Sequence, residues 1–173
     1  MPKIIENLES RLFEEAKKQL FEVGYGALTI RSVAKACGVG IGTVYNYFYS
    51  KDEMISMIML KDLEQCVGSI RQVCAGLDSA EQVLSGIYDH LVLFAKEHSS
   101  LFRDRAEAAA FLGAFNVYRE WLREQLTHIL RSFSRDDFSA EFVAEAMLTW
   151  TMAKKTFEEI YGVVGKLISP IRL

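Results

Sequence analysis

The two prolines of this 173-residue chain lie at its ends, at positions 2 and 170. Because proline interrupts helices more strongly than any other residue, nothing between these positions prevents long helices. Apolar residues of the first segment recur with spacings of three and four, which is the period of an amphipathic helix. They are Ile5, Leu8, Leu12, Phe13, Ala16, Leu20 and Phe21. The sequence shows no strand-like alternation, internal repeat or low-complexity stretch, so we expect an all-α fold.

Glycines and capping residues indicate where the expected helices end. Gly24 and Gly38 are typical of left-handed C-terminal caps, and Thr29 is typical of an N-cap. Ser50 and Glu53 have the spacing of a capping box, in which the Ser50 hydroxyl caps the Glu53 amide and the Glu53 carboxylate returns to the Ser50 amide. The expected helices cover residues 5–23, 30–37, 40–48, 51–73, 79–96, 101–112, 114–133 and 139–167.

The chain is acidic, with a formal net charge of −3, but the charge is unevenly distributed. Residues 1–51 contain seven Lys or Arg and five Glu, a net charge of +2, which leaves −5 for residues 52–173. Between Ala27 and Lys51 there is no acidic residue. A locally basic segment on an acidic chain is compatible with phosphate binding by that segment alone.

Several other classes of protein are disfavoured. No apolar run approaches the ~20 residues that span a bilayer, and the N-terminus has no cleavable apolar region, so we expect a cytoplasmic protein without a membrane partner. The three histidines lack the i, i+4 spacing of a metal pair, and we expect no metal and no other cofactor. The cysteines form no CxxC pair, so we expect buried free thiols at Cys37, Cys66 and Cys74.

The segment from Thr29 to Lys51 contains the strongest functional pattern. Two short expected helices are joined by a turn at Gly38, and the small Ala34 on the first helix allows the second to approach closely. Apolar Val39 and Val44 fix the crossing angle between them. This arrangement leaves the outer face of the second helix free to enter the major groove of DNA.

The residues expected on that outer face have groups that suit a DNA duplex. Hydroxyl and ammonium groups can donate to phosphate oxygens, a guanidinium can reach a guanine edge or a phosphate, and an amide can pair with adenine. An aliphatic side chain can contact a thymine methyl group, and a glycine lets the helix backbone approach closely. The predicted DNA-binding residues are Arg31, Ile41, Gly42, Thr43, Tyr45, Asn46, Tyr47 and Lys51.

From Phe13 to about Ile58 the sequence resembles the DNA-binding domain of the tetracycline-repressor (TetR) family. The matching residues are Ala16, Leu20-Phe21, Gly24-Tyr25, Thr29-Ile30, Val33-Ala34, Gly38-Val39, Gly42-Thr43-Val44-Tyr45, Tyr47-Phe48 and Ser50-Lys51-Asp52-Glu53-Met54. The resemblance covers roughly a quarter of the chain, and its motif is dense enough to be specific.

The resemblance implies a role for individual positions. Its phosphate-contacting pattern falls on Thr43, Tyr45, Tyr47 and Lys51, and its base-reading position in the second helix falls on Arg31. The chain departs from the family at Gly40, where a polar N-cap is usual. Since the start of the recognition helix also offers few hydrogen-bonding side chains, we expect sequence reading to depend on Arg31, Asn46, Ile41 and DNA shape.

The resemblance implies a second, helical domain with two functions. We expect a helix-turn-helix domain over residues 1–50 and a regulatory and dimerisation domain over residues 51–173. By analogy, the helices expected at 114–133 and 139–167 pair with those of a second copy as a four-helix bundle. The apolar surface of the last helix permits this pairing. The predicted interface residues are Phe142, Ala146, Trp150, Phe157 and Tyr161.

The middle helices are rich in large apolar residues. The resemblance implies a cavity there for an apolar small-molecule effector, although such residues are equally compatible with an ordinary core. The predicted pocket residues are Leu91, Phe94, Phe102, Phe111, Phe115, Tyr118 and Trp121.

These observations predict a homodimeric, sequence-specific transcriptional regulator of the repressor type. Its partners would be a palindromic double-stranded DNA operator and an apolar small-molecule effector. In an alternative hypothesis, the DNA-binding domain is kept but the C-terminal domain binds a protein partner. A third hypothesis is a helical enzyme. The sequence contains no GxSxG, HExxH or phosphate-loop motif, so we expect no catalytic activity.

Overall fold

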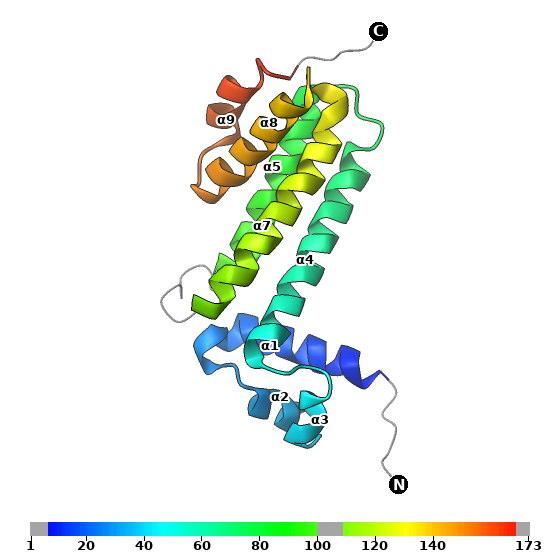
Figure 1. Ribbon diagram of the computed structural model, residues 1–173, viewed down its shortest axis with the longest axis vertical. Helices are drawn as coiled ribbons and strands as arrows, with labels where there is room; N and C mark the ends of the chain where they lie inside the picture. The colour runs from blue at the N-terminus through cyan, green and yellow to red at the C-terminus, as the bar shows by residue number, and fades with distance from the viewer. Residues whose placement is uncertain (1–6, 100–108, 169–173) are drawn as a thin grey trace. The chain divides into compact units, whose positions relative to one another are not determined.

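The computed structural model describes residues 7–99 and 116–168 with their side chains and residues 109–115 as backbone. In these ranges the chain is helical throughout, apart from turns and one isolated bridge between Ser134 and Ile168, and no strand is formed (Figure 1). The prediction of an all-α fold is confirmed. The described chain divides into two compact units, one containing residues 7–61 with 98, 99 and 109–115, the other residues 62–97 and 116–168. The expected domain boundary after residue 50 stays a prediction.

The first unit contains three complete helices and the start of a fourth, besides the first residues of α7 (Ala109–Leu130). They are α1 (Leu8–Ala27), α2 (Ile30–Cys37), α3 (Ile41–Tyr45) and the beginning of α4 (Lys51–Cys74). The helix of α1 is interrupted at Gly24, which has φ 80° and ψ 174°, so the expected cap is a kink followed by one further turn. The core between these helices is apolar and closed to solvent; it includes Leu12, Ala16, Leu20, Leu28, Val33, Val44, Phe48 and Ile58.

The second unit contains the rest of α4 together with α5 (Ala80–Glu97), most of α7 (Ala109–Leu130), a 3₁₀ turn at Arg131–Phe133, α8 (Asp137–Met152) and α9 (Phe157–Val164). Its buried residues line α5, α7 and α8 at helical spacing, as in Val83, Ile87 and Leu91. No described helix has the length and apolar character needed to cross a membrane. Within the described ranges, no cluster of three or more potential metal ligands occurs.

The cysteines are free, as predicted, and Cys37 is buried while Cys66 and Cys74 are half-buried. Burial, helped by the nearby Glu97 carboxylate, raises the pKa of the Cys66 thiol to about 11. Since the thiolate is the reactive form of cysteine, this side chain is protonated and inert near neutral pH.

The expected break between helices at Gly113 is wrong. The structure shows one continuous helix, α7, from Ala109 through Gly113 to Leu130. A glycine inside a helix costs only about 1 kcal/mol relative to alanine, which a helix of this length tolerates. The part of the expected helix 101–112 that precedes residue 109 lies outside the described residues.

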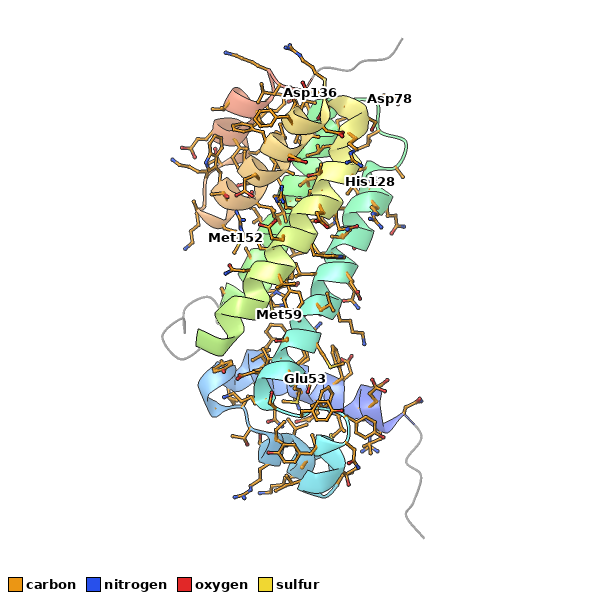
Figure 2. All side chains as sticks on the ribbon, viewed as in Figure 1. Glu53, Met59, Asp78, His128, Asp136 and Met152 are labelled. Atoms are coloured by element: carbon orange, nitrogen blue, oxygen red, sulfur yellow. The ribbon has the colours of Figure 1, made fainter. Side chains whose placement is uncertain are left out.

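The expected single helix over residues 139–167 is also wrong, because it is two helices. Figure 2 marks Asp136 at the start of α8 and Met152 at its end. After Met152 the backbone turns through Lys154, which has φ 60°, and the Lys155 amide donates to the Trp150 carbonyl at 2.9 Å. This is the hydrogen bonding of a Schellman cap, formed here with a lysine in the left-handed position that glycine usually occupies.

A capping box then begins α9. The Thr156 hydroxyl accepts from the Glu159 amide at 3.3 Å, and the Glu159 carboxylate accepts from the Thr156 amide at 2.9 Å. Hydrogen bonds from Lys155 and from the Thr156 amide lower the pKa of Glu159. The Thr-x-x-Glu pattern was visible in the sequence and is sufficient to start a helix.

We expect Thr156→Ala to lower the free energy of unfolding by about 1 kcal/mol, because the substitution removes the side-chain cap of α9. Chemical denaturation followed by circular dichroism measures this change. Glu158→Ala is the matched control, since Glu158 is exposed in the same helical turn and forms none of the capping bonds. Equal destabilisation by both variants would contradict the capping role.

Candidate nucleic-acid interface

Helix α2, which leads into the turn before α3, is fixed at both ends by local hydrogen bonds. The Thr29 hydroxyl accepts from the Ser32 amide at 3.0 Å, and the Ser32 hydroxyl accepts from the Thr29 amide at 3.2 Å, which caps α2. At the other end Gly38 has φ 69°, and the Val39 amide donates to the Ala34 carbonyl at 3.0 Å. Both the Thr29 cap and the Gly38 turn were predicted, and both are confirmed.

The core behind the turn determines which face of α3 is outward. Val33, Ala34, Val44 and Phe48 are all at most 1% exposed. Val39, which we expected to help fix the crossing angle of the two helices, is half-buried. With Val44 and Phe48 held inward, the intervening residues of α3 and of the turn after it face away from the core.

The helix α3 is shorter than expected. It ends at Tyr45, and residues 46 and 47 form a turn in which the Phe48 amide still donates to the Val44 carbonyl at 3.0 Å. Gly40 is its N-cap and offers no side-chain hydrogen bond, in line with the departure noted in the sequence. The short helix therefore depends on its neighbours for its position.

The predicted DNA-binding residues all retain solvent-accessible surface. Tyr45 is 48% and Tyr47 38% exposed, and Arg31, Gly42 and Asn46 are exposed as well. The remaining three, Ile41, Thr43 and Lys51, are half-buried. The structure thus brings these residues to the outside of α2, α3 and the start of α4, within one compact unit.

Lys51 is bound within its own chain. Its Nζ donates to the Tyr25 carbonyl at 2.6 Å and lies 4.1 Å from the centre of the Tyr25 ring. The Tyr25 hydroxyl in turn donates to the Asp52 carboxylate. Sequence reasoning found Lys51 but missed the role of Tyr25, whose place beside Gly24 in the family motif was the available signal.

The first turn of α4 has a variant of the expected capping box. The Ser50 hydroxyl accepts from the Glu53 amide at 3.0 Å, as predicted. The Glu53 carboxylate, however, accepts from the amide of Tyr49 and not from that of Ser50, so this half of the prediction is wrong. Figure 2 marks Glu53 in this first turn. This hydrogen bond fixes the backbone at Tyr49, one residue before the cap.

Tyr49 is a second residue that sequence reasoning missed. Its side chain is 84% exposed, the highest value among the large apolar and aromatic residues exposed in the described chain. Its backbone is fixed by the Glu53 carboxylate while its ring is free. An exposed tyrosine in a helix-turn-helix unit is chemically suited to contact phosphate or sugar.

The predicted pocket residues are only partly described. Leu91 and Phe94 are buried, and Tyr118 and Trp121 are half-buried. Phe102 lies outside the described residues, as do the side chains of Phe111 and Phe115.

Two depressions are described in the second unit, with volumes of about 580 and 340 Å³. Neither is lined by any of the predicted pocket residues. Both have charged or polar residues among their lining, including Arg71 in each. The apolar cavity stays a prediction.

The predicted dimer-interface residues lie on two helices instead of one. On α8, Phe142 is 44% exposed, Ala146 is 6% exposed and Trp150 is half-buried. On α9, the Phe157 ring lies 5.7 Å from Tyr88 of α5 and 5.5 Å from Tyr161. The α9 residues therefore already have packing partners within the chain, and α8 offers the more accessible apolar surface.

Comparison of the sequence with known proteins gives matches in the N-terminal part of the chain. Residues 12–58 match the family described as "Bacterial regulatory proteins, tetR family". The HTH-type transcriptional regulator UidR of Escherichia coli K12 is 26% identical over 78 residues, which are 45% of this chain and 40% of UidR. The sequence similarity to this curated relative thus spans less than half of its length.

Similarity to solved structures extends over nearly the whole chain. A transcriptional regulator, SCO7518, from Streptomyces coelicolor A3(2) superimposes with a TM-score of 0.71 at 14% identity, covering 92% of this chain and 96% of that one. The multidrug binding protein EbrR, solved with imidazole, gives a TM-score of 0.67 at 15% identity, covering 95% and 96%. At such identities the shared fold is what these structures show.

The fold and the capped turn between α2 and α3 define a helix-turn-helix protein with an all-helical C-terminal part. Within it, residues 12–58 match the DNA-binding segment of the TetR family.

We expect Gly38→Ala to lower the free energy of unfolding by about 1 kcal/mol, because alanine is disfavoured in left-handed backbone. Gly42→Ala is the matched control. Gly42 lies inside α3 without a positive φ, and an added Cβ meets nothing within 4 Å. Alanine there should raise stability by up to about 1 kcal/mol through its helix propensity. Urea denaturation compares the two, and changes of the same sign would contradict the role of the Gly38 turn.

Proposed function

We propose that this chain is a sequence-specific DNA-binding transcriptional regulator, of the repressor type, that acts as a homodimer. The observation that supports it most directly is the division of α3 and the turn after it into two sides. Val44 and Phe48 are at most 1% exposed, while Tyr45 and Tyr47 next to them are 48% and 38% exposed. A helix held this way presents hydroxyl groups that match a phosphate backbone.

The charge of this segment agrees with the proposal. No acidic residue occurs between Ala27 and Lys51, while Arg31 and Lys35 are exposed on α2. Since DNA affinity depends mainly on neutralising phosphates, a face without carboxylates avoids repulsion where the duplex approaches. In this proposal Thr43, Tyr45, Tyr47 and Lys51 bind the backbone.

Base reading is assigned to a smaller set of side chains. Arg31 is exposed in the first turn of α2, where its guanidinium can donate two hydrogen bonds to a guanine edge. Asn46 is exposed at the end of α3 and suits adenine, and Ile41 suits a thymine methyl group. Gly42 adds no side chain that would hold the helix away from the bases.

A homodimer would present two recognition helices to a palindromic operator, because the symmetry of the protein is mirrored in its site. The exposed Phe138 and Phe142 lie four residues apart on α8, at 76% and 44% exposure. Such a pair on one helix face is typical of a surface that a second copy covers.

We further propose that an apolar small molecule regulates DNA binding. The similar fold of EbrR, a multidrug binding protein, is compatible with a small-molecule ligand, and we place its site among the C-terminal helices. Such a ligand acts only if it binds more tightly to one arrangement of the DNA-binding units than to another. Selection of bound fragments from random DNA tests the central proposal, since it yields a half-site sequence and its spacing. Recovery of no enriched sequence would contradict it.

We expect Tyr45→Phe and Arg31→Ala to weaken operator binding in different ways. Tyr45→Phe removes one hydroxyl from the phosphate contacts, so affinity should fall by a similar factor on operator and random DNA. Arg31→Ala should cost about 1–3 kcal/mol on the operator and relax discrimination at one base pair per half-site. Fluorescence anisotropy with both DNAs measures this. Equal losses for Arg31→Ala on the two DNAs would reassign Arg31 to backbone binding.

We expect Phe142→Glu to raise the dissociation constant of the dimer by about tenfold or more, because it places a charge in an apolar contact. Sedimentation equilibrium measures the constant. Val23→Glu is the matched control, as Val23 is 55% exposed on α1 and outside the proposed interface. A wild-type chain that is monomeric at all concentrations would rule out the homodimer.

A further inference from the structure

The first turn of α4 contains two opposite charges that are both held by one tyrosine. The Lys51 ammonium binds the Tyr25 carbonyl at 2.6 Å and lies over the Tyr25 ring at 4.1 Å. The hydroxyl at the far end of the same ring donates to the Asp52 carboxylate. Tyr25 is only 8% exposed, so its ring is fixed in the core of the unit.

This arrangement separates two charges that are neighbours in sequence. Lys51 and Asp52 form no ion pair with one another or with any other described residue. The Asp52 carboxylate accepts a hydrogen bond from the tyrosine hydroxyl. The Lys51 ammonium donates to the tyrosine carbonyl and lies over the face of its ring. A lysine ammonium has three N–H donors, so the carbonyl leaves donors for a further acceptor.

We propose that Tyr25 is a positioning residue of the DNA interface, which holds the Lys51 ammonium ready for a backbone phosphate and keeps the Asp52 carboxylate from neutralising it. The proposal rests on the proposed function, since it concerns how that interface is assembled. Two physical effects support it. A lysine docked before binding loses less side-chain freedom on binding. A carboxylate already held by a hydrogen bond is less available to pair with the lysine.

The hydroxyl of Tyr25 can be removed without removing the two contacts that Tyr25 makes with Lys51. Tyr25→Phe keeps the ring and the backbone carbonyl and removes the hydroxyl that donates to Asp52. The freed carboxylate then competes with phosphate for the Lys51 ammonium. We expect affinity for the selected operator to fall about fivefold, the size of one like-charge contact at the surface. We also expect the slope of log affinity against log salt concentration to become shallower by up to about one, as it would if the Lys51 contact were lost.

Asp52→Asn closes a double-mutant cycle. Asparagine still accepts the tyrosine hydrogen bond but carries no charge. Alone, Asp52→Asn should change affinity less than about twofold, because the carboxylate already accepts the Tyr25 hydrogen bond and does not pair with Lys51. Combined with Tyr25→Phe, it should restore both the affinity and the salt slope. Lys51→Ala provides the reference slope for loss of the ammonium contact.

The experiment is anisotropy titration of these five proteins, the wild type included, with operator over a range of KCl concentrations, with circular dichroism melting of each to show that it is folded. Equal affinity and slope for Tyr25→Phe and wild type would overturn the inference. So would a double variant that keeps the loss of Tyr25→Phe. If the wild-type chain binds no DNA, the proposed function itself fails, which is a distinct outcome.

A measurement on the wild-type protein keeps the inference testable if Tyr25→Phe does not fold. The Lys51 side chain lies over an aromatic ring, so its terminal methylene protons should resonate upfield of those of lysines that lie over no ring, as should those of Lys61, which lies 4.1 Å from the Phe13 ring. An ordinary chemical shift for Lys51 would show that its side chain is not docked in solution, and the inference would be wrong.

Discussion

The burial of Val44 and Phe48 is the constraint on which the proposed DNA-binding face depends. The helix that contains Val44 has five residues, far fewer than the roughly 12–15 that an isolated helix needs in water. Burying each of these side chains contributes about 1.5–3 kcal/mol, which the short helix cannot gain from its own hydrogen bonds. Because both point inward, Tyr45 and Tyr47 are held outward. Stability and recognition are thus properties of opposite sides of one element.

Local signals explain how much of this could be predicted from the sequence. Thr29, Gly38 and Ser50 each act within three or four residues of their own position, and the structure shows all three in the expected roles. The all-α fold follows from the helical period and from the absence of internal proline. Two local signals were misread. Gly113 was expected to end a helix and does not, and the capping box at Thr156, which does begin a helix, was not used.

The contacts that the sequence could not predict are those between distant segments. Lys51 and Asp52 meet Tyr25 across separations of 26 and 27 residues. No periodicity or spacing rule specifies which carbonyl a lysine will bind at such a distance. The same holds for Phe157, which appeared as free apolar surface when its helix was taken to be continuous with α8. Once the chain turns at Lys154, that side chain meets Tyr88 instead.

The start of α4 shows how one helix end meets two opposing electrostatic demands. Asp52 and Glu53 in the first turn stabilise the helix through its dipole, yet carboxylates beside a DNA-binding surface repel phosphates. In the structure each carboxylate already has a donor: Asp52 accepts from the Tyr25 hydroxyl and Glu53 from the Tyr49 amide. The favourable interaction with the helix dipole is kept, while the negative charge is partly offset by hydrogen bonds within the fold. Lys51, the cation of this turn, keeps ammonium donors beyond the one given to the Tyr25 carbonyl, so in the proposed function its position matters more than the net charge of the segment for binding a phosphate.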